Sequence, residues 1–346
     1  MTDTAPVEGI DAERVTAWLA ARVPEIAPPL RFDLIAGGHS NLTYRVTDTA
    51  GRRWVLRRPP LGLVLATAHD MGREHRIISA LAGHVPVPPV VGLCADDEVN
   101  GAPFYVMDFV DGTVVRDVPE AELLDLDQRR RAGESLVEVL AAIHDVDVDA
   151  VGLGDLGRKE AYLERQLKRW HGQWESSRTR DLPVVDEVHA RLAGAVPDQG
   201  PATIVHGDYR LDNCMLAADG SVVAVLDWEL CTLGDPLADL GLLCVYWADP
   251  GEPTLSGLPA ATTVEGFVTK AELVERYAAL TGRDVSMVGY YTAFGYWKLA
   301  CILQGVYARY SAGAMGDRGE AGEFDVFGQQ VEALAEAAKA TLDGLG

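Results

Sequence analysis

Two neighbouring stretches decide the fold: residues 204–216, IVHGDYRLDNCML, and residues 223–229, VAVLDWE. Asp208 lies five residues before Asn213 and 19 before Asp227. Phosphoryl transfer requires a carboxylate that meets the acceptor hydroxyl and hard oxygen ligands that hold Mg²⁺ on nucleotide phosphates. An Asp-x-x-x-x-Asn loop that opens onto a hairpin, followed by a second Asp at the end of the next strand, supplies these groups.

The region upstream of this motif has the pattern of a strand-rich layer with one internal helix. Residues 32–46 contain two apolar runs around Gly37 and its neighbouring glycine, which is a hairpin signal. Residues 52–58 predict a third strand and residues 104–112 a further one. Between them, residues 70–82 carry apolar side chains at helical spacing. A proline-rich stretch, VPVPPVVGLC, leads into another strand.

Beyond residue 113 the pattern becomes mainly helical. Two short strands, residues 202–208 and 221–229, are expected to be joined through a turn at Asp219-Gly220. The chain is long enough for about two domains. We therefore predict an α+β fold with a small β-rich lobe at 1–108, a hinge at 109–113 and a larger helical lobe at 114–346. The predicted helices are 120–145, 158–178, 184–195, 232–247, 269–281, 288–312 and 325–342.

The motif His-Gly-Asp-x-x-x-x-Asn with Leu-Asp-Trp-Glu resembles the aminoglycoside phosphotransferase family, and so does the later run GDPLADL (234–240). These are small-molecule kinases with a bilobal, protein-kinase-like fold, and the resemblance covers roughly residues 30–315. It implies ATP and Mg²⁺ as cofactors, Asp208 as catalytic base, and Asn213 and Asp227 as metal ligands. His206 would orient the loop by hydrogen bonding. Within GDPLADL, the two aspartates are expected to cap a helix and anchor the loop.

The nucleotide side departs from the pattern of protein kinases. The turn GGHSN (37–41) is glycine-poor, and a plain hairpin turn is the alternative interpretation. Its backbone N–H groups and the Ser40 hydroxyl are candidates for phosphate contact. The candidate residues there are Gly37, Gly38, Ser40 and Asn41.

No lysine precedes Lys159, so the basic residue expected on the third strand must be an arginine. Strand alternation favours Arg57, which shares a face with an apolar residue two positions earlier; Arg58 is the alternative. Glu74, 17 residues further on in the one helix of this lobe, is the expected ion-pair partner. A solvated surface glutamate is the other interpretation.

We expect the hinge backbone, at residues 107–110, to meet the adenine. The candidate residues are Met107, Asp108 and Val110, with Met107 alternatively a core residue.

The acceptor is indicated by a short basic segment in a chain that is acidic overall. Residues 158–180 hold seven basic and three acidic residues, and place Arg165 with Arg169, and Trp170 with Trp174, at i, i+4. Such a face suits an anionic or acyl-bearing substrate. The alternative is a solvated helix that packs its tryptophans. Residues 290–310 add Lys298, Tyr307 and Arg309 as candidates for substrate contact. The alternative is that these side chains belong to the core.

Together these helices resemble a subgroup of the family whose members are in part fused to acyl-CoA dehydrogenase domains and are associated with hydroxy-acid or hydroxyacyl substrates. A cationic aminoglycoside is the alternative acceptor. The alternative of another class is a catalytically inactive nucleotide-binding module. Neither a metal-spaced histidine pair nor a G-x-S-x-G elbow is present.

Composition excludes several further classes. The 346 residues carry a net charge of −22, which disfavours nucleic-acid and anionic-membrane partners. Residues 1–110 account for 13 acidic and 10 basic residues, so most of the excess lies beyond them. The five cysteines form no C-x-x-C pair, and the N-terminus lacks the apolar core of a signal peptide. No stretch approaches 18 apolar residues. We expect a cytoplasmic enzyme for a small molecule.

Overall fold

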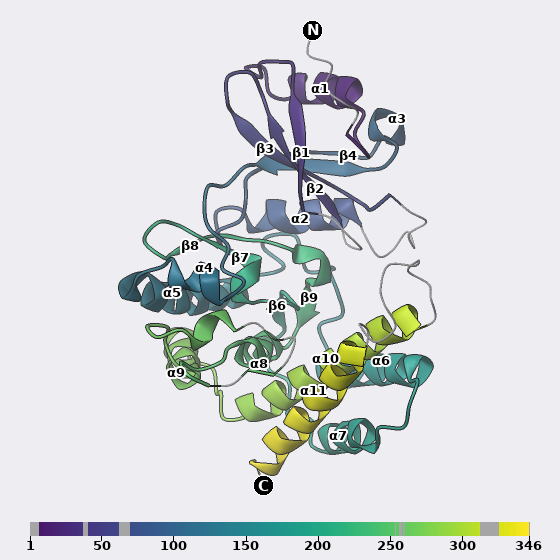
Figure 1. Cartoon of the computed structure of the whole chain (residues 1–346), viewed down its shortest axis with the longest axis vertical. Helices are drawn as coiled ribbons and strands as arrows, with labels where there is room; N and C mark the ends of the chain where they lie inside the picture. Colours follow the sequence, from purple (N-terminus) through teal and green to yellow (C-terminus); the bar gives the residue numbers. More distant parts are fainter. Residues whose placement is uncertain are drawn as a thin grey trace. The chain divides into compact units, whose positions relative to one another are not determined.

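The structure is a computed structural model of the chain and describes residues 7–36, 41–61, 70–252, 254–255, 258, 260–311 and 325–345. It divides into two compact units (Figure 1). The first comprises Met1–Gly112 together with Val223–Glu229, and the second comprises Thr113–Val222 together with Leu230–Gly346. The segment that carries Asp227 therefore groups with the first unit. Among the described residues, no helix is both long and apolar enough to cross a membrane.

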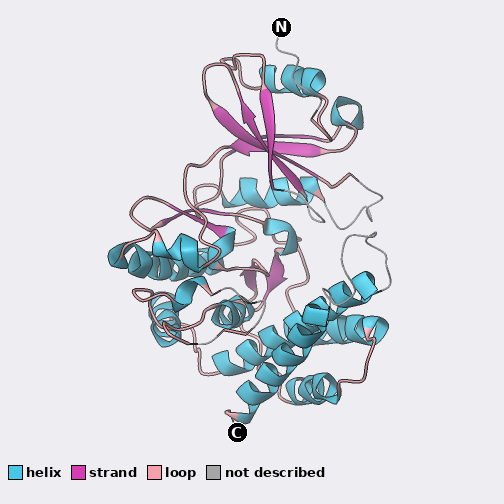
Figure 2. Cartoon of the chain, viewed as in Figure 1, coloured by secondary structure: helices cyan, strands magenta, loops and turns pink. Residues whose placement is uncertain are grey.

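The first unit is built on a five-stranded antiparallel sheet with strand order β1-β2-β3-β5-β4 (Figure 2). The hairpin and the third strand lie where the sequence predicts them, because apolar and polar residues alternate there. The strands are β1 (Arg31–Ala36), β2 (Leu42–Thr47), β3 (Arg53–Arg58), β4 (Val90–Cys94) and β5 (Phe104–Asp108).

Helices cover both faces of this sheet. Helix α1 (Ala12–Ala20) packs its buried residues into a core with Trp54, Leu56 and Phe104. The intervening residues of β3 point to the opposite face, where α2 (Met71–Leu81) lies. The short α3 (Asp97–Asn100) contacts α1. The alternation therefore brings Arg57 to the α2 face of the sheet.

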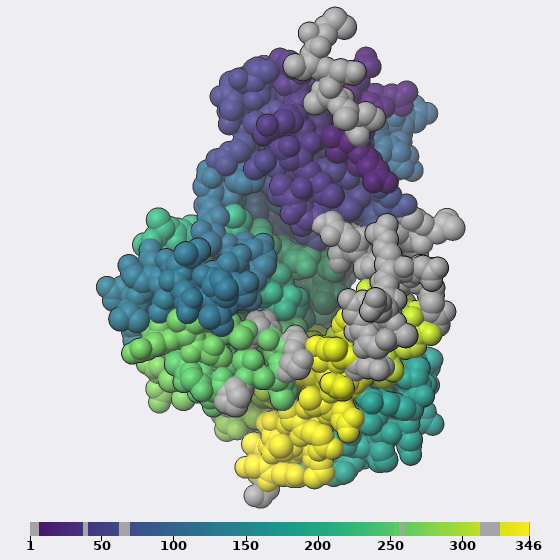
Figure 3. Space-filling model, viewed as in Figure 1, coloured from purple at the N-terminus to yellow at the C-terminus, as the bar shows by residue number. Residues whose placement is uncertain are grey.

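The second unit is mainly helical. Its core joins α6, α7, α10 and α11 and contains Trp174 and Trp297, both fully buried. Figure 3 shows α11 (yellow) beside the teal segment that contains α6 and α7. The helices are α4 (Val118–Glu122), α5 (Leu126–Asp145), α6 (Tyr162–Ser177), α7 (Pro183–Gly194), α8 (Leu237–Tyr246), α9 (Lys270–Thr281), α10 (Val288–Ser311) and α11 (Asp325–Asp343). The short strands are β6 (Thr203–Val205), β7 (Cys214–Leu216), β8 (Val222–Val225) and β9 (Thr232–Gly234).

Two predicted helices have different boundaries in the structure. The predicted helix 120–145 is two helices, because the Asp125 side chain caps α5 by accepting from its N3 backbone. The predicted helix 232–247 begins as β9, and α8 starts only after Pro236. The expected pairing of strands also changes. Strand β6 pairs with β9, and the turn at Asp219-Gly220 joins β7 to β8 instead.

Candidate active site

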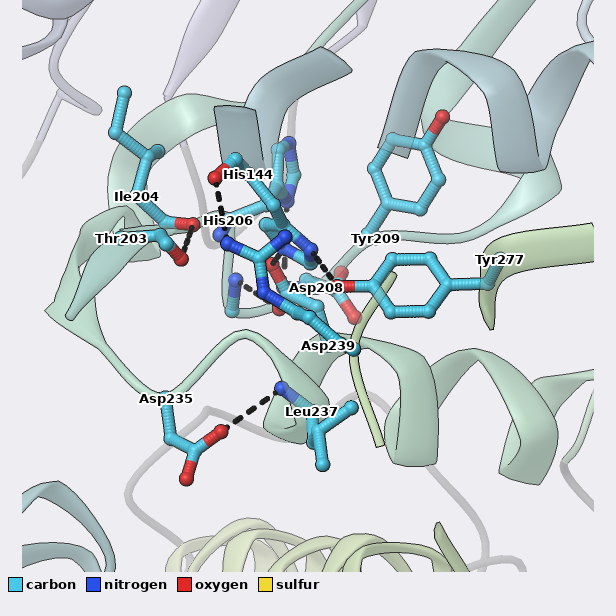
Figure 4. Close-up of polar contacts among 12 residues, drawn as sticks. His144, Thr203, Ile204, His206, Asp208, Tyr209, Asp235, Leu237, Asp239 and Tyr277 are labelled. Atoms are coloured by element: carbon cyan, nitrogen blue, oxygen red, sulfur yellow. Dashed lines mark hydrogen bonds and ion pairs between the residues drawn. The ribbon is translucent and has the colours of Figure 1, made fainter. Parts of the chain in front are cut away.

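The loop that follows β6 carries Asp208 and is held by one buried carboxylate. Asp239, on α8, accepts the backbone N–H of His206 at 2.6 Å and that of Gly207 at 2.8 Å (Figure 4). Gly207 has a φ of +87°, a conformation that favours glycine. The Asp208 N–H donates to His206 Nδ1 at 3.3 Å. His206 is fully buried, and its contact with the Asp208 N–H restrains the backbone between these two residues.

Asn213 fixes the orientation of the Asp208 carboxylate. It ends a 3₁₀ turn, Leu211–Asn213, and its Nδ2 donates both to Asp208 O (2.8 Å) and to Asp208 Oδ2 (2.9 Å). Because both bonds use the amide nitrogen, the carbonyl oxygen of Asn213 is directed elsewhere.

Asp208 has two further neighbours that the sequence does not reveal. Arg210 Nε lies 3.4 Å from Asp208 Oδ2 and 3.1 Å from Asp212 Oδ1. Burial raises the pKa of Tyr246, and a hydrogen bond to Asp208 adds to this effect. Tyr246 comes from the end of α8, 38 positions beyond Asp208, at no spacing that marks it.

A buried hydrogen-bond network supports the Asp208 loop. His144 Nε2 lies 3.4 Å from Asp239 Oδ2, and His144 Nδ1 lies 2.7 Å from the Tyr277 hydroxyl. A carboxylate only accepts, so Nε2 carries the proton and Nδ1 accepts from Tyr277. Burial lowers the pKa of His144, while Asp239 opposes that shift. Burial opposes ionisation of Asp239, but bonds from His144 and Gly207 keep its pKa below the ordinary value.

The first aspartate of GDPLADL, Asp235, caps helix α8 and does not hold the Asp208 loop. Asp235 Oδ1 accepts the Leu237 N–H at 3.0 Å, at the start of α8, and Oδ2 accepts the Tyr291 hydroxyl at 2.6 Å. Of the two aspartates expected to cap a helix and anchor the loop, Asp235 therefore takes the first role and Asp239 the second.

Lys298 contacts the same loop from α10. Its Nζ donates to the carbonyl of Gly207 at 3.0 Å and lies 5.9 Å from the centre of the Trp170 ring. The residue is 8% exposed. Burial lowers the pKa of Lys298, whereas Asp239 and Asp208 raise it and Arg169 lowers it further. Asp239, Asp208 and Arg169 therefore lie close enough to Lys298 to affect its pKa.

In the first unit, Arg57 joins two carboxylates. Arg57 Nε lies 3.3 Å from Glu74 Oε2, and Nη2 donates to Asp227 Oδ1 at 2.5 Å. Asp227 has a φ of +62°, which is unusual for a residue with a side chain. Arg58 lies on the other face of β3, where it donates to the carbonyls of Gly9 and Asn100.

Burial and neighbouring charges affect the pKa values of Glu74 and Arg57 in different ways. Burial raises the pKa of Glu74, and Arg57 opposes the shift. Burial also disfavours the charged form of Arg57, but Glu74, Tyr105 and Asp227 together hold its pKa above the ordinary value. Tyr105, on β5, lies close enough to Glu74 to affect its pKa. The sequence does not identify Tyr105 as a site residue, because an aromatic residue in a strand is typical of the hydrophobic core.

The remaining nucleotide-side candidates fall partly outside the described residues. Gly37, Gly38 and Ser40 lie outside them. Asn41 Nδ2 donates to Glu229 Oε2 at 3.4 Å. Met107 is buried and pairs with Val55 and Val90 in the sheet.

Two hinge amides are engaged within the sheet. The Asp108 N–H donates to Pro89 O at 2.8 Å, and the Phe109 N–H donates to Arg53 O at 3.4 Å. The side chain of Asp108 is exposed. Val110, two residues after Asp108, lies beyond the end of β5.

The six remaining acceptor candidates occupy different environments. Trp174 is fully buried in the helical core, which argues for packing rather than substrate contact. Trp170 is 8% exposed and stacks under Arg169, whose guanidinium carbon lies 4.9 Å from the ring centre. Arg165 Nη2 donates to the Arg158 carbonyl. Tyr307 is partly buried and Arg309 is exposed, near the C-terminal end of α10.

The antiparallel-sheet unit and the helical unit are those of the protein-kinase-like phosphotransferase fold. A crystal structure from Ralstonia eutropha JMP134, assigned to the aminoglycoside phosphotransferases, has a TM-score of 0.80 at 33% identity, over 96% of this chain and 98% of that one. The streptomycin–ATP ternary complex of APH(2″)-IIa shares the fold, with a TM-score of 0.58 at 15% identity over 86% and 91%. Residues 31–270 match the model of the phosphotransferase enzyme family (APH), and the chain belongs to this family.

Curated relatives are longer proteins. Acyl-CoA dehydrogenase family member 10 of Mus musculus is 38% identical over 285 residues, which are 81% of this chain and 26% of that protein. Acyl-CoA dehydrogenase family member 11 of Gallus gallus is 34% identical over 310 residues, 87% of this chain and 39% of that protein. The chain thus spans less than half the length of these relatives.

Proposed function

We propose that this chain is an ATP- and Mg²⁺-dependent phosphotransferase that acts on a hydroxyl group of a small molecule, with Asp208 as the catalytic base. The observation that carries the proposal is the pair of hydrogen bonds from Asn213 Nδ2 to the backbone and the carboxylate of Asp208. A base must be held in one orientation to meet an acceptor hydroxyl. Asn213 and the loop contacts of Asp239 supply that restraint.

The donor set fits Mg²⁺. Asn213 keeps its carbonyl oxygen directed away from Asp208, and Asp227 adds a partly exposed carboxylate. Hard oxygen ligands of this kind suit Mg²⁺. When bound, the ion neutralises charge on the nucleotide phosphates. The residues that would hold it are Asn213 and Asp227.

The nucleotide would be held by the first unit. Arg57 is a permanently charged donor, and its contact with Glu74 keeps the guanidinium on the α2 face of the sheet. Because the Asp108 and Phe109 amides are engaged in the sheet, the Val110 amide is the hinge donor that we assign to adenine, with the Asp108 carbonyl as acceptor. The names of neighbours support the use of a nucleotide, since APH(2″)-IIa was solved with ATP and APH(2″)-IIIa with GDP.

For the acceptor we favour an anionic hydroxy acid or a hydroxyacyl compound. Arg169 lies over the Trp170 ring, and this pair of a cation and an aromatic ring lies beside Lys298, which contacts the Asp208 loop. The names of the curated relatives, acyl-CoA dehydrogenase family members 10 and 11, support an acyl-bearing compound. The alternative, an aminoglycoside, is favoured by the assignment of the Ralstonia eutropha protein.

A panel of acceptors read by ADP release tests the proposal. Hydroxy acids, hydroxyacyl-CoA compounds and aminoglycosides are each supplied with Mg²⁺-ATP. Activity on the first two groups supports the proposed acceptor class, and activity on aminoglycosides alone overturns it. If Mg²⁺-ATP shifts the melting temperature but neither acceptors nor water yield ADP, the chain is a nucleotide-binding module.

Asp208→Ala tests the base. A positioned general base contributes about 10²–10⁴-fold to the rate, so we expect turnover to fall by at least about 10²-fold. The melting temperature should remain close to that of the wild type, because the side chain of Asp208 is partly exposed. Exchange of the exposed Asp219, in the turn before β8, for alanine is the matched control and should leave turnover unchanged. Wild-type turnover in Asp208→Ala would refute the assignment.

A further inference from the structure

Lys298 places a buried ammonium group against the backbone of the Asp208 loop. Its Nζ donates to the Gly207 carbonyl at 3.0 Å, and its side chain is 8% exposed. On the N–H side of the same loop, Asp239 accepts from His206 and Gly207. Helices α10 and α8 therefore hold this backbone by its acceptor and by its donors.

This contact fixes the peptide group that leads into Asp208. The peptide bond is planar, so restraining the Gly207 carbonyl also restrains the Asp208 nitrogen and Cα. The other end of the same peptide, the Asp208 N–H, donates to His206 Nδ1. Gly207, at a φ of +87°, has no side chain that would otherwise limit its rotation. The orientation of Asp208 thus depends on contacts from outside the loop.

A neutral donor would satisfy the Gly207 carbonyl without the desolvation penalty of a buried cation. The chain instead keeps an ammonium there, with no carboxylate within ion-pair distance among the described residues. At longer range Asp239 and Asp208 favour the charged form, against the larger effect of burial on the pKa of Lys298. A costly group at this position indicates a functional requirement rather than a contribution to stability.

We propose that Lys298 is a positioning residue, which orients Asp208 through the Gly207 carbonyl and does not bind the acceptor. The inference rests on the proposed function and revises the expectation that Lys298 contacts substrate. It predicts that Lys298 matters for every acceptor, including water, because its effect passes through the base.

The test measures ATP hydrolysis with water as acceptor, together with the affinity for Mg²⁺-ATP. Lys298→Met preserves the chain length and removes the donor. A misplacement of about 1 Å costs roughly 10²-fold, so we expect hydrolysis to fall 10- to 10²-fold with unchanged nucleotide affinity. Lys298→Gln keeps an N–H donor and should retain more activity than Lys298→Met. Lys168→Met, on the exposed side of α6, is the matched control and should be unaffected.

A double variant separates positioning from independent effects. In the Asp208→Asn background, Lys298→Met should cost little more, since residues that act as a unit are not additive. If the losses of hydrolysis in the two single variants multiply in the double variant, the proposal is wrong. Full hydrolysis by Lys298→Met, or a variant that raises only the KM for the acceptor, would also overturn it. Melting temperatures of both Lys298 variants identify any loss caused by unfolding. A wild type that neither binds nor hydrolyses Mg²⁺-ATP would instead refute the proposed function itself.

Discussion

Arg57 shows how one residue can connect separate parts of the first unit. A guanidinium presents donors in a fork, so Nε meets Glu74 on α2 while Nη2 meets Asp227 in the segment after β8. A lysine ammonium, as a single point charge, would not present two separate donor edges in this way. The arginine therefore contacts both carboxylates through separate donor edges.

Arg57→Met should lower the free energy of unfolding strongly. The Arg57 side chain is 12% exposed and that of Glu74 is 2% exposed, so the variant leaves a buried carboxylate without its partner. Breaking such a pair costs about 3–5 kcal/mol, whereas replacing both partners by apolar residues is often nearly neutral. We expect Arg57→Met with Glu74→Leu to recover most of the loss. Denaturant unfolding, followed through the transition of the first unit, measures both changes.

An exposed ion pair provides the control for this comparison. Arg191 Nη1 lies 2.5 Å from Asp343 Oδ1, but their side chains are 36% and 51% exposed. Surface pairs contribute about 0–1 kcal/mol, so Arg191→Met should barely change the unfolding free energy. If both arginine variants lose the same small amount, the Arg57 cluster has no special role in stability.

At the scale of elements, local patterns predict the secondary structure but not the supports of the site. The hairpin, β3 and α2 follow from alternation and helical spacing, and Asp208, Asn213 and Asp227 from their order in the chain. Strand β9 could not be predicted, because three residues carry no period and its partner β6 lies about thirty positions earlier.

The contacts that hold the Asp208 loop could likewise not be predicted from the local sequence. The contact of His144 with Asp239 spans 95 positions and that with Tyr277 spans 133. In the sequence, His144 has no partner at a recognisable spacing and reads as a surface or core histidine. Only the packing of α5, α8 and α9 brings these side chains together.

The buried His144, in contact with residues of α8 and α9, predicts a dependence of stability on pH. Burial lowers the pKa of His144 in the folded chain below its value in the unfolded chain, about 6.5. Between the two pKa values the unfolded state binds the extra proton. The stabilisation is therefore complete above about pH 6.5 and declines as the pH falls, by up to about 1.4 kcal/mol per pH unit. Denaturant unfolding between pH 7.5 and 5 measures this slope.

Two variants assign the slope to His144. His144→Asn removes the titrating ring and should flatten the part of the slope that it causes. Tyr277→Phe removes the hydroxyl at Nδ1 but retains the ring, so the slope should remain while overall stability falls. An unchanged slope in His144→Asn would show that other groups, such as His75 and His189 with their lowered pKa values, account for it.

At the scale of the molecule, the path of the chain couples the two units. The chain passes from the first unit to the second after Gly112, returns at Val223 and leaves again after Glu229. The returning segment is held in the first unit by Arg57 at Asp227 and by the Val225 N–H, which donates to Pro86 O at 2.9 Å. Both ends of this segment continue into the second unit.

We therefore expect the two units to unfold in a single transition, although chains with two compact units often do not. In calorimetry the ratio of the calorimetric to the van't Hoff enthalpy should be about one. Arg57→Met, which releases Asp227, should separate the transition into two, with the first unit melting earlier. Arg191→Met lies within the second unit and should leave a single transition. Two transitions in the wild type would show that the segment Val223–Glu229 does not couple the units, whatever Arg57 contributes locally.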